Sequence, residues 1–160
     1  MTQTPFDIVI IHRNTLGVTS ACIDSLRTSS SRDVVNIIVV DNGSTDGSAQ
    51  ELARVYPFIT LIEAHQNLGY AKACNLGAKS AHHDYIVFSN SDVRYTTDCL
   101  SELISCLEND TSIGLCGPQQ FFPDGSWQRS YDLFPGPIIA IRNLFGITAL
   151  HRRLLSRRTV

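Results

Sequence analysis

The residues whose types could do chemistry gather in three polar loops, and each loop follows an apolar run typical of a buried strand. The loops are His12-Arg13-Asn14, Asp41-Asn42-Gly43 and Asn90-Ser91-Asp92. If the strands are parallel neighbours, their carboxyl ends meet at one sheet edge, and a guanidinium, two carboxylates and several amides surround one crevice. Such a set suits a nucleotide bound through a divalent cation, because one carboxylate can bind the base or ribose while a second holds the metal.

Asp41 is the residue on which this expectation depends most. It directly follows the run Ile37-Ile38-Val39-Val40, so we expect its carboxylate to project from the strand end and accept hydrogen bonds from a ring N–H or a sugar hydroxyl. Asp, Asn and Gly also dominate simple turns for backbone reasons, and the loop alone leaves both interpretations open. Ser44 or Thr45 is expected to cap the next helix, with Asp46 near the positive end of its dipole.

Alternating strands and helices are expected to position these loops. The apolar runs predict strands over residues 6–11, 35–40, 58–62, 84–89 and 113–117, and helices over 16–28, 46–55, 70–80 and 97–108. Apolar residues at helical spacing are expected to face the core, among them Val18, Cys22 and Leu26 of the first helix and Leu52 and Val55 of the second. Strands and helices that alternate at short intervals predict βαβ units, and therefore a mostly parallel α/β sheet flanked by helices.

Composition and charge exclude several classes of protein. The chain has 160 residues, 43% hydrophobic and 18% charged, which is typical of a globular domain. A formal net charge of −2 argues against a dedicated nucleic-acid binder, and the loop after the first strand lacks both G-x-G-x-x-G and a P-loop. The five cysteines form no C-x-x-C pair, which favours reduced thiols. With no signal peptide or membrane span in the pattern, the chain is expected to be cytoplasmic.

The last part of the chain has a different pattern. A hairpin is expected over residues 121–127 around Pro123-Asp124-Gly125, and residues 136–160 are predicted to form a basic amphipathic helical tail after a core over residues 1–135. Such a helix can lie on an anionic membrane, which would make the protein peripheral at the inner face of the membrane. The same pattern is expected of a helix that packs on a missing half or on a second copy as a homodimer, and this interpretation is favoured.

Several ordered motifs together resemble one known family. They are the opening strand with Asn14, the run Val39-Val40-Asp41-Asn42-Gly43-Ser44-Thr45-Asp46-Gly47-Ser48, Asn67-Leu68-Gly69-Tyr70-Ala71 leading to Asn75-Leu76-Gly77, Asn90-Ser91-Asp92, and Gly117-Pro118 followed by Pro123-Asp124-Gly125-Ser126. Over residues 7–135 the chain resembles the nucleotide-sugar-binding half of a family 2 glycosyltransferase with the GT-A (Rossmann-like) fold. Bacterial rhamnosyltransferases and other cell-surface glycan transferases are of this kind.

The resemblance implies a role for each matching residue in a donor site. Asp41 matches an aspartate that binds the base of a nucleotide-diphosphate sugar, and Arg13 matches a residue, often tyrosine, that packs on the base; a planar guanidinium can stack there too. Asp92 matches the D-x-D carboxylate that holds Mg²⁺ or Mn²⁺ against the diphosphate, and Asn90 departs from the acidic form of that motif. The remaining residues expected near the donor are Asn14, Gly69 and Lys72.

The resemblance also implies the reaction. It is an inverting, metal-dependent transfer to a glycan or lipid-linked acceptor in cell-surface polysaccharide biosynthesis. Inverting relatives take a carboxylate base from a later Glu-Asp motif, and after Trp127 the only acidic residue is Asp132. We therefore expect a fragment, truncated before the acceptor-binding half, that binds a donor but transfers poorly, with its catalytic base unknown. A non-catalytic nucleotide-binding or interaction module of the same fold is the alternative.

Overall fold

The computed structural model describes residues 4–29 and 35–129. The chain divides into two compact units, Met1–Pro118 and Gln119–Val160. The predicted core boundary at residue 135 and the predicted helical tail over 136–160 lie outside the described residues, and both stay predictions.

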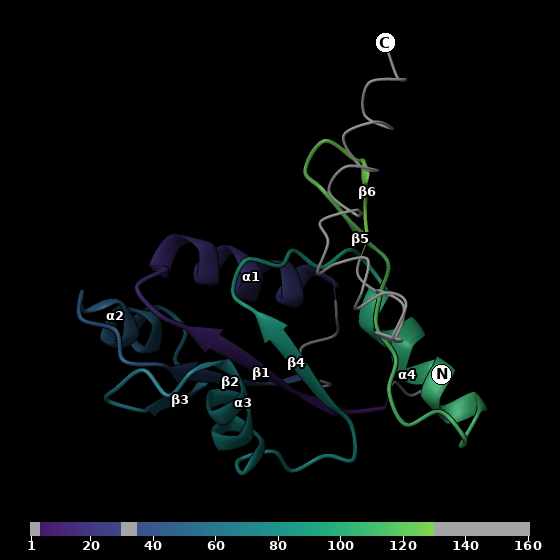
Figure 1. Ribbon diagram of the computed structural model, residues 1–160, viewed down its shortest axis with the longest axis horizontal. Coiled ribbons are helices and arrows are strands. Elements are labelled where there is room, and N and C mark those ends of the chain that lie inside the picture. Colours follow the sequence, from purple (N-terminus) through teal and green to yellow (C-terminus); the bar gives the residue numbers. More distant parts are fainter. Residues whose placement is uncertain (1–3, 30–34, 130–160) are drawn as a thin grey trace, which may run out of the picture. The chain divides into compact units, whose positions relative to one another are not determined.

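Four strands form one parallel sheet within the first unit (Figure 1). They are β1 (Phe6–His12), β2 (Val35–Asp41), β3 (Thr60–Glu63) and β4 (Ile86–Asn90), in the spatial order β3-β2-β1-β4. The central strands β1 and β2 are buried along most of their length, which explains why they read as continuous apolar runs. The predicted parallel α/β sheet is therefore confirmed.

Helices cover both faces of this sheet. They are α1 (Leu16–Ser29), α2 (Ser48–Val55), α3 (Tyr70–Ala78) and α4 (Cys99–Asn109). Side chains of α1, α2 and α4 share one apolar cluster with Ile8 and Ile10 of β1, whereas α3 packs on the opposite face against Val9 and Val40. Alternate residues of each strand point to opposite faces, so this alternation decides which loop residue meets which helix.

Gly77 lets α3 lie close to the sheet. A Cβ at this position would come within 2.9 Å of a Val40 methyl group and would overlap a Val9 methyl group. The close approach helps to fix where the amino end of α3 lies, at the edge of the sheet where the strands end.

Two of the apolar residues predicted to face the core are exposed. Val18 and Val55 are each 47% exposed. In α1, Thr19 is buried in place of Val18 because its hydroxyl binds His12. In α2, the buried residues are Ser48, Ala49 and Leu52, and Val55 falls beside the stripe that they form.

The predicted strand over residues 113–117 is wrong. These residues form no ladder with another strand of the described chain, and Leu115 is 87% exposed. Gly114 and Gly117 interrupt the run, and glycine weakens a strand because it gains no packing and costs more entropy to order.

The predicted hairpin is confirmed in the second unit. β5 (Gln120–Phe121) pairs antiparallel with β6 (Trp127–Gln128). The turn between them places Gly125 at φ 81, and Phe122 N donates to Ser126 O at 2.9 Å. Asp124 accepts hydrogen bonds from the backbone and hydroxyl of Ser126, which stabilises the turn.

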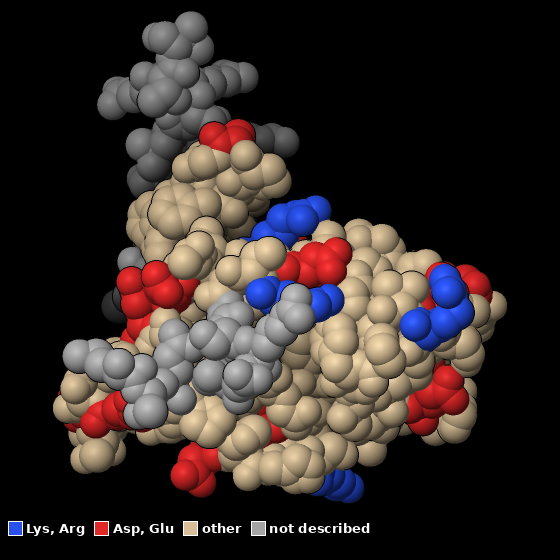
Figure 2. Space-filling model, turned by 180° about the vertical axis from the view of Figure 1, so that it is seen from behind, with Lys and Arg blue, Asp and Glu red and all other residues tan. Residues whose placement is uncertain are grey.

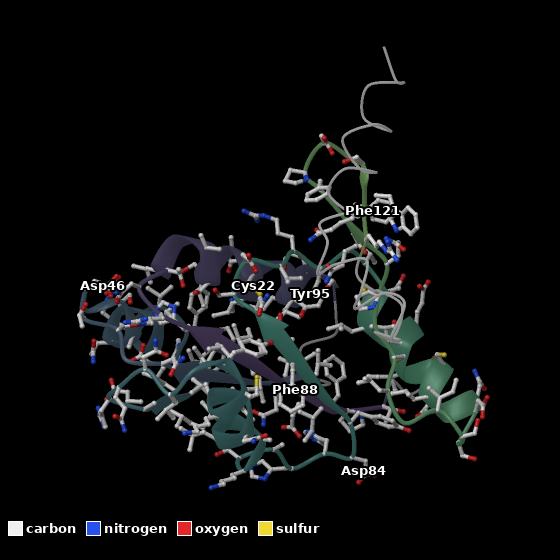
Figure 3. The ribbon with its side chains drawn as sticks, in the orientation of Figure 1. Cys22, Asp46, Asp84, Phe88, Tyr95 and Phe121 are labelled. Carbon is white, nitrogen blue, oxygen red and sulfur yellow. The ribbon has the colours of Figure 1, made fainter. Side chains whose placement is uncertain are left out.

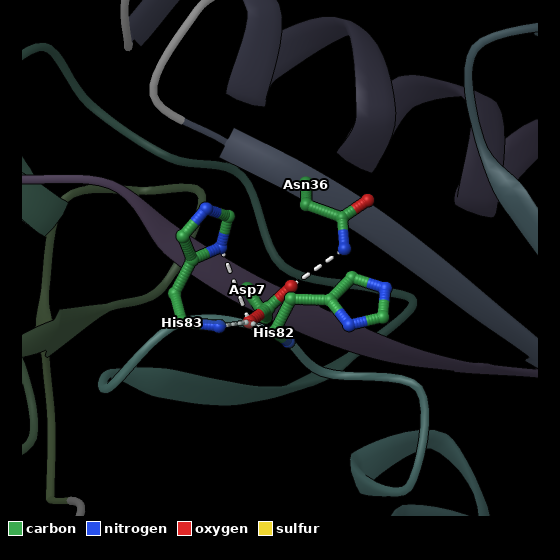
Figure 4. Close-up of polar contacts among 4 residues, drawn as sticks. All are labelled: Asp7, Asn36, His82 and His83. Atoms are coloured by element: carbon green, nitrogen blue, oxygen red, sulfur yellow. Dashed lines mark hydrogen bonds and ion pairs between the residues drawn. The ribbon is translucent and has the colours of Figure 1, made fainter.

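A buried carboxylate, Asp7, lies at the amino end of the parallel sheet, where its strands begin (Figure 4). Asp7 is fully buried and accepts hydrogen bonds from His82 N at 2.8 Å, His83 N at 2.6 Å and Asn36 Nδ2 at 2.5 Å. His83 Nδ1 lies 3.2 Å from Asp7 Oδ2, but without hydrogen-bond geometry. The loop before β4 is therefore tied to β1 through its backbone, and is not simply solvated.

Charged side chains of both signs are interspersed over the face shown in Figure 2. This pattern agrees with the small formal net charge of −2. Within residues 4–29 and 35–129, no helix has both the length and the apolar character needed to cross a bilayer. All five cysteines are free thiols.

Candidate functional site

The strand register brings the three polar loops to one edge of the sheet. His12 of β1 pairs with Asp41 of β2, and Ile11 of β1 pairs with Asn90 of β4. Neighbouring strands lie about 4.8 Å apart, so the ends of β2 and β4, on either side of β1, are separated by roughly 10 Å. Asp41 and the Asn90-Ser91-Asp92 loop therefore share an edge, as the sequence predicts.

Asp41 lies at the end of β2 and is only 5% exposed. Ser44 N is 3.1 Å from Oδ1 and 3.2 Å from Oδ2, and the Ser44 hydroxyl donates to Oδ1. Oδ2 therefore keeps most of its lone-pair capacity for a further donor. The prediction that Ser44 or Thr45 caps α2 is wrong, because the helix begins after Gly47, which has a left-handed backbone and no side-chain cap.

Asn14 joins the loop after β1 to the loop after β2. Its backbone is left-handed at φ 51, its Oδ1 accepts from Thr45 N at 2.9 Å, and its N donates to Ser44 Oγ at 3.0 Å. Asn14 therefore holds the Asp41 loop in place through contacts within the protein. Its neighbour Arg13 is exposed, so its guanidinium is accessible to a planar ligand.

Asn42 joins the loop after β2 to the loop before α3. Its Oδ1 accepts from Leu68 N at 2.8 Å, and its Nδ2 donates to Asn67 Oδ1 at 3.1 Å. Gly43, at φ 78, lies against the backbone of Gln66 and Asn67, where a Cβ would come within 2.6 Å of a carbonyl carbon. The two loops therefore pack together so closely that only glycine fits.

The amino end of α3 lies next to this contact. Gly69 N donates to Asn67 Oδ1 at 3.0 Å, and α3 begins after Gly69 without a side-chain cap. The first turn of a helix presents unpaired N–H groups and the positive end of the dipole. Lys72, in the same turn, is exposed. Gly69 and Lys72 thus border a position where a phosphate could be bound.

Buried donors hold the carboxyl end of β4. Ser89 Oγ donates to Asn90 O at 2.8 Å, the Tyr95 hydroxyl donates to Ser89 Oγ at 2.7 Å, and Cys22 Sγ lies 3.9 Å from Asn90 O. Figure 3 shows Cys22 and Tyr95 together near this strand end. Burial raises the pKa of the Cys22 thiol to about 11 and also raises the pKa of Tyr95, so both groups keep their protons at neutral pH.

Asp92 and Asn90 are exposed residues at this edge. Among residues 4–29 and 35–129, no group of three or more His, Cys, Asp or Glu side chains could hold a metal ion. Mg²⁺ and similar hard cations often bind through one or two carboxylates, with phosphates and water completing the shell. The donor set therefore fits a cation that binds together with a diphosphate, and does not fit a metal held by the protein alone.

The sequence interpretation places His12 in a loop and gives it no role, whereas it is the last residue of β1. It is fully buried and binds hydroxyls of α1 and α2 through its two ring nitrogens. Strand alternation was a usable signal, because Ile8, Ile10 and His12 are two residues apart and lie on the same face of β1. The same alternation along β2, through Ile38 and Val40, places Asn42 on the face of the sheet that α3 covers.

The sequence of this chain matches one family model over nearly its whole length. The model described as Glycosyl transferase family 2 matches residues 7–157. The chain belongs to glycosyl transferase family 2. This family 2 chain is 31% identical over 115 residues to N-acetylglucosaminyl-diphospho-decaprenol L-rhamnosyltransferase of Mycobacterium tuberculosis, an alignment that covers 65% of this chain and 38% of the relative. The aligned part therefore spans well under half the length of that relative.

Two solved structures share the fold of this family 2 chain. The mannosyltransferase PcManGT from Pyrobaculum calidifontis has a TM-score of 0.57 at 24% identity, over 63% of this chain and 31% of that one. S. aureus TarS has a TM-score of 0.60 at 19% identity, over 75% of this chain and 40% of that one. The likeness confirms the predicted GT-A fold.

Proposed function

We propose that this family 2 chain binds a nucleotide-diphosphate sugar, together with Mg²⁺ or Mn²⁺, at the carboxyl edge of its sheet. The observation that carries the proposal is the placement of Asp41 and Asp92 in loops on either side of the β1 end. A nucleoside diphosphate is long enough to reach from one loop to the other, because their strands are only two interstrand spacings apart.

On the base side, Asp41 Oδ2 accepts a hydrogen bond from a ring N–H while Arg13 stacks on the ring. The carboxylate is held in place before binding by Ser44, so little conformational entropy is lost when a ligand binds. Asn14 acts indirectly, since its amide oxygen is already bonded to Thr45 N. These contacts support binding of a base but do not select one base over another.

On the diphosphate side, Asp92 holds the cation, Asn90 accepts from a ribose hydroxyl, and Gly69 and Lys72 face the phosphates. When bound, the cation stabilises the negative charge that develops on the leaving nucleoside diphosphate. The mannosyltransferase PcManGT was solved in complex with GDP-Man and Mn²⁺, which supports the choice of metal. The uncapped amino end of α3 supplies further positive potential.

We propose an inverting transfer for the whole protein. The acceptor hydroxyl attacks the anomeric carbon, the bond from that carbon to the diphosphate breaks, and a carboxylate base takes the hydroxyl proton. Similarity to a rhamnosyltransferase supports a glycan or lipid-linked acceptor in cell-surface polysaccharide biosynthesis. As part of the same proposal, the reaction takes place in the cytoplasm at the inner face of the membrane.

Titration calorimetry on the full chain tests donor binding. UDP, GDP and dTDP are titrated with and without Mn²⁺, and we expect one of them to bind about tenfold more tightly with the metal, as for a single strong charge-assisted contact. Asp92→Asn should abolish this Mn²⁺ effect. Asp84→Asn is the matched control, because Asp84 is an exposed residue just before the first residue of β4, at the opposite end of the strand from Asp92 (Figure 3). It should leave the Mn²⁺ effect unchanged.

A failure of all three nucleotides to bind at millimolar concentration would contradict the proposal, and so would an equal Mn²⁺ effect in Asp92→Asn. Release of free sugar from nucleotide sugars then separates an enzyme from a non-catalytic nucleotide-binding module. Donor binding without any sugar release or transfer would favour the module.

A further inference from the structure

His12 is a fully buried imidazole at the end of β1 whose two ring nitrogens contact hydroxyls from different helices. Nδ1 lies 2.8 Å from Thr19 Oγ1 in α1 and 3.2 Å from Thr15 Oγ1 just before that helix. Nε2 lies 2.8 Å from Ser48 Oγ, at the first residue of α2. Loss of the ring would take one hydrogen-bond partner from each of these hydroxyls, which is costly in a site of low dielectric constant.

The hydrogen-bond network determines which ring nitrogen carries the proton. Hydrogen bonds from the side chain and backbone of Ser48 lower the pKa of Asp46, so its carboxylate is ionised and can only accept. The Ser48 hydroxyl donates its single hydrogen to Asp46 and must accept from His12 Nε2–H. Nδ1 is then unprotonated, and it accepts from the hydroxyl of Thr19 or Thr15.

The same network reaches both loops of the candidate site. Thr15 Oγ1 lies 3.5 Å from Ser91 Oγ, in the loop that carries Asp92. On the other side, His12 O accepts from Asn42 N at 2.8 Å, next to Asp41. His12 therefore contacts the Asp41 loop through its backbone, and reaches the Asp92 loop through the contact of its ring with Thr15.

We propose that His12, as a neutral Nε2–H imidazole, is a positioning residue that sets the Asp41 loop and the Asp92 loop at the separation a donor needs. It acts without touching the donor, because its ring is buried among hydroxyls. This inference rests on the proposed function, since it concerns the same site.

The charge state of the ring follows from its surroundings. Burial lowers the pKa of His12, and the carboxylates of Asp41 on β2 and Asp46 before α2 oppose that shift without cancelling it. From the side of α1, Thr15 and Thr19 present hydroxyls to the ring. The imidazole is therefore neutral at pH 7, and a proton added at lower pH takes away the acceptor at Nδ1.

His12→Gln tests the positioning role. A glutamine amide can reach the Nε2 position and keep the Ser48 contact, but it cannot also accept from Thr19. We expect the Mn²⁺ complex of the best-bound nucleoside diphosphate to bind about tenfold more weakly, the effect of one lost buried hydrogen bond. His82→Gln makes the same substitution at an exposed histidine at the other end of the sheet and should leave the dissociation constant unchanged.

A pH series separates positioning from mere filling of space. As pH falls through the pKa of His12, which burial places below the 6.5 of an unperturbed histidine, the advantage of the wild-type chain over His12→Gln should shrink. A side chain that only fills volume would give the same ratio of dissociation constants at every pH. His82→Gln should follow the wild-type curve.

Nuclear magnetic resonance of the free chain keeps this test independent of donor binding. Long-range ¹H–¹⁵N spectra should show the Nε2–H tautomer, and the amides of Asn42, Ser44 and Ser91 should shift in His12→Gln but not in His82→Gln. Thr15→Val keeps the imidazole and removes the link to Ser91, so it reports on the same coupling if His12→Gln does not fold.

The outcomes distinguish the two claims. A wild-type chain that binds no nucleoside diphosphate, yet shows the tautomer and the amide shifts, would overturn the proposed function and leave the loop coupling intact. An Nδ1–H tautomer, or an unchanged dissociation constant in both His12→Gln and Thr15→Val, would overturn the positioning role alone.

Discussion

Gly43→Ala, measured against Gly47→Ala, tests how closely the loops of the proposed donor site pack. Both glycines have a left-handed backbone, at φ 78 and φ 77. A Cβ at Gly43 would meet the backbone of Gln66 and Asn67 at 2.6 to 2.9 Å, whereas a Cβ at Gly47 would meet nothing within 4 Å. The two substitutions share the backbone strain, and only one adds a steric clash.

The expected free energies of unfolding follow from this difference. The left-handed conformation costs alanine about 1–2 kcal/mol, and the stiffer unfolded chain returns about 0.4–1 kcal/mol, so Gly47→Ala should destabilise the chain by about 1 kcal/mol. Gly43→Ala adds an overpacking cost of about 1–3 kcal/mol, because backbone atoms cannot rotate away as a side chain can. Its total cost should be about 2–4 kcal/mol.

Urea denaturation of the two variants measures these costs, and calorimetry with a nucleoside diphosphate and Mn²⁺ measures the effect on the site. Gly43→Ala should also weaken nucleotide binding, since it pushes the Asp41 loop away from the loop before α3, while Gly47→Ala should bind as the wild type does. Equal losses of stability in the two variants would show that the loops do not pack as described.

Three further predictions concern polar groups at the two ends of the sheet strands. Asp7→Asn should destabilise the chain by about 2–3 kcal/mol, because backbone N–H groups lose an ionised acceptor; a loss under 0.5 kcal/mol in urea would contradict this. The pKa of His12 is lowered from 6.5 in the folded state, and that of Asp7 is lowered from 3.8. As pH drops, the unfolded chain therefore takes up each proton before the folded chain does, and the free energy of unfolding should fall in two steps, first for His12 and then for Asp7. Urea midpoints against pH should lose the first step in His12→Gln. Tyr95→Phe should cost about 1 kcal/mol through the bond to Ser89, whereas Tyr85→Phe should cost less, and the reverse order would contradict the role given to Tyr95.

The sequence predicts the fold well where local pattern and tertiary environment agree. The continuous apolar runs of β1 and β2 are strands because helices cover both faces of the sheet. The prediction fails where a tertiary contact overrides local pattern. Thr19 replaces Val18 in the core because the buried ring of His12 offers its hydroxyl a partner. The strand predicted over residues 113–117 fails for a local reason, because Gly114 and Gly117 interrupt the apolar run.

The candidate site is predictable in its placement and not in its internal contacts. Polar residues after parallel strands must meet at one edge, so the proximity of Asp41 to the loop carrying Asp92 follows from topology alone. That Asn14 bonds to Thr45, and that Ser44 binds Asp41 instead of capping α2, depends on where loops lie in three dimensions. No periodicity in the sequence encodes those positions.

Paramagnetic broadening by Mn²⁺ in the presence of a nucleoside diphosphate tests the central claim most directly. We expect substoichiometric Mn²⁺ to broaden the amide signals of Asp92 and its neighbours most strongly, those of the Asp41 loop to a lesser degree, and those of His82 and Asp84 at the opposite end of the sheet not at all. Broadening centred on His82 and Asp84, or the same weak broadening over the whole chain, would contradict a donor site at this edge.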